Sequence, residues 1–247
     1  MMQMTETVKQ LLIINIILFI GCMFVPAANE YLAVWYFENP LFKFWQPITY
    51  MFMHASLGHI FFNMFALYAF GSTLEYMWGP KKFLFFYISC GLGSLLFHMG
   101  INYFQFHDAL DILVSAGFNQ TEIYNSLASE QADSRWLQVL GQEDYISFIR
   151  AYWTPMVGAS GAIYGLLAAF AFLFPNAELA LMFIPIPIKA KIFVPILILI
   201  DLFSGVTGRS IMGDNIAHFA HVGGALVGIL IVLYWKKNQF NQNRWDR

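Results

Sequence analysis

Charged side chains are scarce in this sequence. They make up 11% of its 247 residues, whereas a soluble domain usually carries about 25%. Apolar residues make up 59% of the chain and fall in long blocks. The shortage of charge argues against an ordinary soluble domain, and the blocks predict a polytopic protein whose surroundings are a lipid bilayer.

Two further absences exclude other classes of protein. The net charge is −2 and no dense basic cluster is present, so we expect no nucleic-acid partner. The sequence has only two cysteines, Cys22 and Cys90, and both lie inside apolar runs. They form neither a zinc-binding spacing nor a disulfide framework, so we expect two small buried residues.

The apolar blocks predict an all-α bundle of six transmembrane helices, because about 20 apolar residues are needed to cross a bilayer. We interpret the chain as a single membrane domain over 1–247. The first block, after Lys9, has the length of a signal-peptide core, but we expect a retained helix because further spans follow it. The six predicted spans are 9–26, 56–77, 82–103, 157–174, 190–206 and 215–235. The proline-rich stretch FIPIPIKAK before the fifth span predicts an extended loop.

The basic residues predict the orientation of these spans. Nine of the thirteen lysines and arginines lie in the two terminal tails and in the loops after the second and fourth spans. Both termini are therefore expected on the cytoplasmic face of a cell's cytoplasmic (inner) membrane. The segment 104–152 is expected on the outer side, where it is too polar to cross and can carry short amphipathic helices. Its function is not evident from the sequence.

Polar residues of three predicted spans converge at one depth, because the second, fourth and sixth spans all run from the outer face inward. His59 and Asn63 are four residues apart on one face of the second span. Ser160 is expected about one turn inside the fourth span. His221 lies near the start of the sixth, one turn after His218, which we expect to be structural or solvating.

This set of side chains predicts a serine hydrolase. An imidazole such as His221 can take the proton of the Ser160 hydroxyl and so activate it as a nucleophile. The imidazole of His59, the amide of Asn63 and the backbone N–H of Ser160 can donate hydrogen bonds to a developing oxyanion. No acidic residue is expected at this depth, so the sequence favours a Ser–His dyad, with no cofactor and no metal.

Several of these residues also allow a structural interpretation. Glycines at helix interfaces commonly serve close packing, which could explain Gly158, Gly161 and Gly165 and better explains Gly224 and Gly228. A metal site at one of the histidine pairs is a further alternative. Glu75 is expected to form a hydrogen bond between helices, His54 to hold a loop or face the lipid headgroups, and Asp201 has no assigned role.

The motifs resemble those of the rhomboid intramembrane serine proteases over roughly 40–100 and 150–235. Gly158-Ala159-Ser160-Gly161 matches the family's Gly-x-Ser-Gly nucleophile motif, and Ala220-His221-Val222-Gly223-Gly224 matches its Ala-His-x-x-Gly base motif. His54, His59 and Asn63 match a third motif on the second span. The resemblance implies an oxyanion hole formed by His59, Asn63 and the Ser160 N–H. It also implies that Tyr164 stacks on His221, with Gly158 and Gly161 beside the nucleophile.

The resemblance implies an endopeptidase that cleaves transmembrane protein substrates near the outer membrane face, with small residues at the cut and helix-destabilising residues nearby. A helix must unwind locally to present its carbonyls. One departure is Gln46, at a position where the family often has arginine. An inactive rhomboid-like protein that binds membrane clients is the main alternative, and a small transporter is a weaker one. Neither the natural substrate nor the oligomeric state follows from the sequence.

Overall fold

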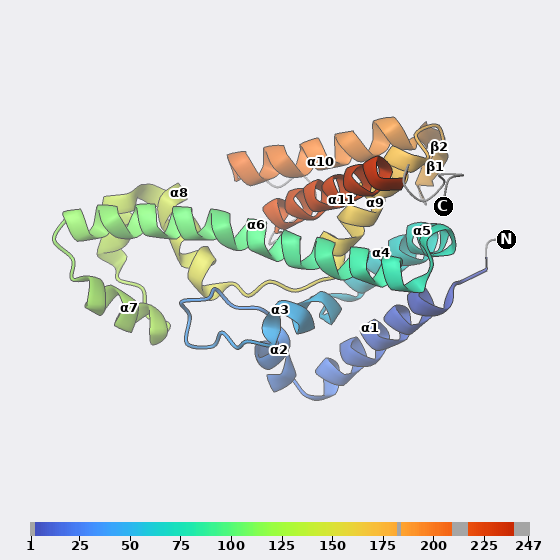
Figure 1. Cartoon of the computed structure of the whole chain (residues 1–247). Helices are drawn as coiled ribbons and strands as arrows, with labels where there is room; N and C mark the ends of the chain where they lie inside the picture. The colour runs from blue at the N-terminus through green and yellow to red at the C-terminus, as the bar shows by residue number, and fades with distance from the viewer. Residues whose placement is uncertain (1–2, 182–183, 209–216, 240–247) are drawn as a thin grey trace.

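The chain folds as a helical membrane bundle (Figure 1) in the computed structural model, which describes residues 3–181, 184–208 and 217–239. Five span-length apolar helical segments occur in these ranges, together with the shorter apolar helix α9. The prediction of an all-α, multi-pass membrane protein is therefore confirmed. The helices are α1 Glu6–Phe24, α2 Ala27–Leu32, α3 Gln46–Thr49, α4 Leu57–Ala66, α5 Ser72–Trp78, α6 Pro80–Ser115, α7 Gln120–Ala128, α8 Ser134–Trp153, α9 Ser160–Leu173, α10 Ala190–Thr207 and α11 His218–Gln239.

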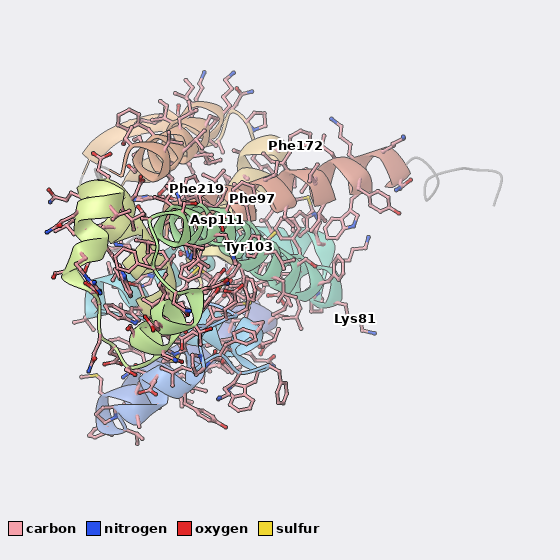
Figure 2. The ribbon with its side chains drawn as sticks, turned by 90° about the vertical axis from the view of Figure 1, so that its left-hand side faces the viewer. Lys81, Phe97, Tyr103, Asp111, Phe172 and Phe219 are labelled. Carbon is pink, nitrogen blue, oxygen red and sulfur yellow. The ribbon has the colours of Figure 1, made fainter. Side chains whose placement is uncertain are left out.

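Helices α6, α9 and α11 form the centre of the bundle and pack on one another. Helix α10 lies on one side of this centre and α1 on the opposite side, as both views show (Figures 1 and 2). The start of α1 and the end of α11 lie at the same end of the molecule, whereas α7 and α8 lie at the other end (Figure 1). Lys81, at the start of α6, points away from the bundle (Figure 2).

Small residues let α9 lie close to its neighbours. A Cβ atom on Gly224 of α11 would overlap the carbonyl of Gly161, and one on Gly228 would lie 2.7 Å from the carbonyl oxygen of Gly165. Close approach of backbones at glycine is a common means of joining helices in a membrane. The structural interpretation of Gly224 and Gly228 is therefore confirmed.

The second span contains a local irregularity. Helices α4 and α5 continue one another through a π-helical turn, Leu67–Gly71, and together form the span 57–78. Glu75 in α5 contacts the start of α1: its carboxylate accepts hydrogen bonds from the Thr5 hydroxyl at 2.5 Å and from the backbone N–H groups of Thr7 at 3.0 Å and Val8 at 2.9 Å. Glu75 thus forms the predicted hydrogen bonds between helices, and it also caps α1 by satisfying N–H groups that would otherwise lack partners.

The third span is longer than predicted. Helix α6 runs for 36 residues, well past the expected end at residue 103. Its additional turns bury Phe106 and Leu110 and expose charged residues such as Asp108 and Asp111, so the helix continues without being apolar throughout. This extension packs against α8.

The segment 104–152 has its own hydrophobic core. Trp136 and Phe148 of α8 are buried there, and the rings of Phe106 and Phe148 stack at a centroid distance of 4.7 Å. Asn119 and Asp133 cap α7 and α8 with their side-chain oxygens. The predicted short helices are therefore present, and they form a packed unit at one end of the bundle.

The connection between α9 and α10 is extended, as the prolines predicted. It forms a two-stranded antiparallel hairpin, β1 Glu178–Leu181 and β2 Ile184–Lys189. Glu178 pairs with Lys189, and Leu179 pairs with Ile188. The hairpin ends at Lys189, directly before the first residue of α10.

Candidate active site

Ser160 is the first residue of α9. The prediction that it lies one turn inside the helix is wrong, because Gly158 has a φ of +129°, which prevents the helix from starting earlier. The backbone N–H of Gly158 donates to the Tyr50 carbonyl at 2.9 Å. Ser160 therefore lies at a helix N-terminus, where backbone N–H groups have no partner within the helix.

Ser160 and His221 are within hydrogen-bond distance. His221 Nε2 lies 2.8 Å from Ser160 Oγ, although 61 residues separate them in the sequence. The rings of Tyr164 and His221 stack with centroids 4.1 Å apart and planes 12° apart. Tyr164 lies one helical turn after Ser160, so a single helix carries both the hydroxyl and the ring that covers the imidazole.

A carboxylate lies on the other side of His221. Asp201 Oδ1, on α10, is 3.1 Å from His221 Nδ1 and 2.6 Å from His218 Nδ1. The Tyr164 hydroxyl donates a hydrogen bond to Oδ2 of the same carboxylate. Asp201 is 1% exposed. The prediction that no acidic residue lies at this depth is therefore wrong.

The sequence did contain a signal for Asp201. Helix α10 ends at Thr207, six residues after Asp201, so the carboxylate lies about 9 Å from that end of the helix. Ser160 and His221 lie at a similar depth from the ends of their spans, so the sequence predicts Asp201 beside them.

His59 borders the same region from α4. Its Nδ1 accepts a hydrogen bond from the backbone N–H of Ala55 at 3.4 Å, which leaves the proton on Nε2. A Cβ atom on Gly158 would lie 2.9 Å from this Nε2 and 3.5 Å from Ser160 Oγ. The space that a side chain on Gly158 would fill is therefore adjacent to both the donor nitrogen of His59 and the hydroxyl of Ser160, and glycine leaves it open.

Asn63 provides a second donor on α4. Its side chain is buried, and Nδ2 has no hydrogen-bond partner among the described residues. Buried amide groups are usually paired, so an unpaired one needs an explanation. Asn63 Nδ2 is therefore a buried donor whose acceptor is not among the described residues.

His54 is buried rather than facing lipid headgroups, so that part of the prediction is wrong. It is 6% exposed, and its ring meets that of His59 edge-on at a centroid distance of 5.0 Å. Burial, with a smaller contribution from the neighbouring His59, lowers the pKa of His54 to about 3. His54 is therefore neutral near pH 7.

Gln46 organises the loop before the second span. It is fully buried, and its Oε1 accepts the backbone N–H of Lys43 at 3.0 Å while its Nε2 donates to the Leu41 carbonyl at 3.0 Å. A neutral amide can both accept and donate in this way. Gln46 thus holds the loop by contacts that an arginine, which only donates, could not reproduce in full.

The metal-site alternative finds no support in the geometry. Among the residues that the structure describes, no group of three His, Cys, Asp or Glu side chains has the arrangement of a metal site. The arrangement around Ser160 contains a hydroxyl, the His221 imidazole at hydrogen-bond distance, and the His59 imidazole beyond the space next to Gly158. These are the components of acyl transfer.

A family model described as "Rhomboid domain" matches residues 41–118 and 132–238 of the chain. The match includes Ser160, His221, His59 and Asn63, and it leaves out part of the segment between α6 and α8. It covers well over half of the sequence.

Three curated relatives illustrate the similarity. "Rhomboid protein 1, mitochondrial" of Saccharomyces cerevisiae is 26% identical over 186 residues, 75% of this chain and 40% of that protein. "RHOMBOID-like protein 12, mitochondrial" of Arabidopsis thaliana is 29% identical over 193 residues, 78% of this chain and 47% of that protein. "Presenilin-associated rhomboid-like protein A, mitochondrial" of Danio rerio is 26% identical over 242 residues, 95% of this chain and 50% of that protein. The chain thus spans half or less of the length of these relatives.

The names of these relatives correct the predicted location. All three are mitochondrial proteins. The prediction of a cell's cytoplasmic membrane, with the site toward its outer face, is therefore wrong. The distribution of basic residues predicts which ends of the spans share a membrane face, but it does not identify the membrane.

Proposed function

The chain belongs to the rhomboid family, and from that premise we propose that it is an intramembrane serine endopeptidase with Ser160 as nucleophile and His221 as general base. The observation that carries the proposal is the 2.8 Å separation of His221 Nε2 and Ser160 Oγ. That distance is within the range for direct proton transfer.

The reaction begins when Ser160 Oγ attacks a peptide carbonyl and its proton passes to His221 Nε2. The imidazolium then gives this proton to the leaving amine, which departs and leaves an acyl-enzyme on Ser160. Water attacks the ester in a second step, with His221 again as base. Tyr164 restricts the imidazole to one plane throughout, because the two rings stack.

The oxyanion is stabilised by donors on the side of Ser160 that faces α4. His59 Nε2–H, Asn63 Nδ2–H and the Ser160 backbone N–H are the proposed donors. Fixed donors of this kind act where charge develops in the transition state and require no rearrangement during the reaction. Gly158 gives the substrate backbone room to approach. Gly161 gives α9 its close contact with α11 at the same level.

The proposed substrates are transmembrane protein segments in the mitochondrial inner membrane. Ser160 is the first residue of α9, His221 lies in the first turn of α11, and the segment that carries α7 and α8 leads into the start of α9. We therefore place cleavage toward the membrane face on which that segment lies. The mitochondrial location is supported by the printed names of the relatives. We also propose that residues 1–247 form a single membrane domain.

Cleavage in reconstituted vesicles tests the proposal. Wild type, Ser160→Ala and His221→Ala are compared at equal folded amounts on a panel of transmembrane substrates with small residues at the cut. We expect cleavage by wild type and none above background by either variant. Equal cleavage by all three proteins would contradict the proposal. Binding of the substrates by wild type with no cleavage would instead favour the inactive, client-binding alternative.

A further inference from the structure

The buried carboxylate of Asp201 is not explained by the two-residue mechanism. Asp201 is 1% exposed within a membrane bundle, and an ionisable residue in such a place is costly and usually functional. It accepts hydrogen bonds on both oxygens. Oδ1 contacts the two imidazoles of His218 and His221, and Oδ2 contacts the Tyr164 hydroxyl.

These contacts determine the protonation of His221. An ionised carboxylate only accepts hydrogen bonds, so the nitrogen that faces Asp201, Nδ1, must carry a proton. In the neutral ring, Nε2 is then the unprotonated nitrogen. That nitrogen lies 2.8 Å from Ser160 Oγ and can take its proton. The carboxylate thus holds His221 in the tautomer that a general base needs.

The position of Asp201 is fixed by packing as well as by hydrogen bonds. Gly205, one turn further along α10, lies under the ring of Phe219, and a Cβ atom at Gly205 would be 3.0 Å from that ring. Figure 2 shows Phe219 beneath the α10 ribbon, on the side that faces α6. Phe219 lies between His218 and His221 in the sequence, so this contact aligns α10 with the turn of α11 that carries both imidazoles.

We propose that Asp201 is a positioning residue that completes a Ser160–His221–Asp201 triad, and that it shares its carboxylate with His218. This inference rests on the proposed protease function. During attack by Ser160, His221 becomes an imidazolium and Asp201 remains ionised. Its charge lies 3.1 Å from Nδ1 and stabilises the new positive charge where little water is available. Tyr164 and His218 hold the carboxylate in place while this occurs.

The test compares wild type with Asp201→Asn in the same vesicles. Asparagine keeps the size of the side chain and an acceptor oxygen for the two imidazoles, but it removes the charge. We expect kcat to fall by up to about 10⁴-fold, the loss caused by the comparable change in a serine-protease triad, with little change in KM. The second-order rate of Ser160 labelling by a fluorophosphonate should fall as well.

Glu75→Gln is the matched control. It also converts a buried, multiply hydrogen-bonded carboxylate into an amide, but Glu75 contacts α1 and none of the site residues. We expect a lower midpoint of thermal unfolding, with unchanged labelling of Ser160 per folded molecule. This control separates the loss of the Asp201 charge from a general loss of stability.

Three results would decide against the triad. Labelling of Asp201→Asn at the wild-type rate per folded molecule overturns it and leaves the protease proposal intact. An unlabelled, inactive wild type overturns both proposals. If Asp201→Asn does not fold, Asp201→Ala with added formate is the second variant: restored cleavage supports the triad, and a folded variant that formate does not restore contradicts it.

Discussion

At the scale of single residues, hydrogen bonds assign a proton to one nitrogen of each of two histidines. Asp201 faces His221 Nδ1, and the backbone N–H of Ala55 faces His59 Nδ1. The first partner is an acceptor and the second a donor, so the two rings adopt opposite tautomers. His221 therefore offers a lone pair beside Ser160, whereas His59 offers an N–H.

Replacing Asn63 tests the oxyanion side of the site. The Asn63 Nδ2 donor has no partner among the described residues, so Asn63→Ala should have little effect on the thermal midpoint. We expect kcat to fall by about 10²–10³-fold, because a donor to the transition state is lost, with little change in KM. Kinetic measurements on one transmembrane substrate check this. A rise in KM at constant kcat would assign Asn63 to ground-state binding instead.

Replacing His54 tests the effect of burial on pH stability. Its pKa falls from 6.5 to about 3 on folding, so the unfolded state binds the additional proton below pH 6.5. The free energy of unfolding is therefore at its full value well above pH 6.5, and it decreases as the pH drops from 6.5 toward 3. Between pH 7.5 and 5.5 His54 lowers the free energy of unfolding by about 1.4 kcal/mol. Thermal unfolding of His54→Phe should show a smaller difference between these two pH values than wild type; an equal difference would show that other groups cause the acid sensitivity.

At the scale of helices, α9 determines how the site is assembled. It is short, it begins at Ser160, and it packs closely on α11 through facing glycines. The separation of Ser160 and His221 is therefore set by backbone contacts rather than by flexible side chains. A change in this contact should move the hydroxyl relative to the imidazole.

Two glycine substitutions test this contact. Gly224→Ala places a methyl group on the Gly161 carbonyl, so we expect a loss of about 1–3 kcal/mol of stability and reduced cleavage. Gly100→Ala is the matched control in α6, because a Cβ there meets nothing within 4 Å, and we expect no loss. Thermal unfolding and cleavage are measured for both. Equal stability of the two variants would argue against close packing of α9 on α11.

The sequence predicts helices more reliably than it predicts their partners. Long apolar runs are sufficient to locate the membrane spans, because the bilayer sets their length. They do not set the end of α6, since an amphipathic helix can continue beyond the bilayer. The start of α9 depends on the backbone angles of Gly158, and the partners of Asp201 depend on how α10 lies beside α11. Both follow from tertiary packing, although the depth of Asp201 within its span could be calculated from the sequence.

At the scale of the whole molecule, the two largest hydrophobic clusters of the described residues serve as two cores. One lies among the membrane helices, and the other joins the end of α6 to α7 and α8. The second core lies at the opposite end of the molecule from the start of α1 (Figure 1). His107 of α6 and Tyr124 of α7 both bind the carboxylate of Glu38 in the first loop, so this core is also tied to the loop that Gln46 holds.

Weakening the second core should make α7 and α8 accessible to protease while the site around Ser160 stays intact. Phe148 is fully buried and stacks on Phe106, so Phe148→Ala should cost about 3–5 kcal/mol within this unit. We expect faster cleavage by trypsin after the exposed Arg150, while a fluorophosphonate still labels Ser160. Gel analysis of both reactions checks this. Simultaneous loss of labelling and of trypsin resistance would show that the two cores unfold together.

The most direct test of the central claim is to locate the covalent adduct that a fluorophosphonate forms with the folded protein. Mass spectrometry of the digested protein identifies the labelled residue. We expect one adduct, on Ser160 in wild type, and a strongly reduced amount of it in His221→Ala. An adduct on another residue, or none on protein that is folded in vesicles, would contradict the assignment of Ser160 as a nucleophile.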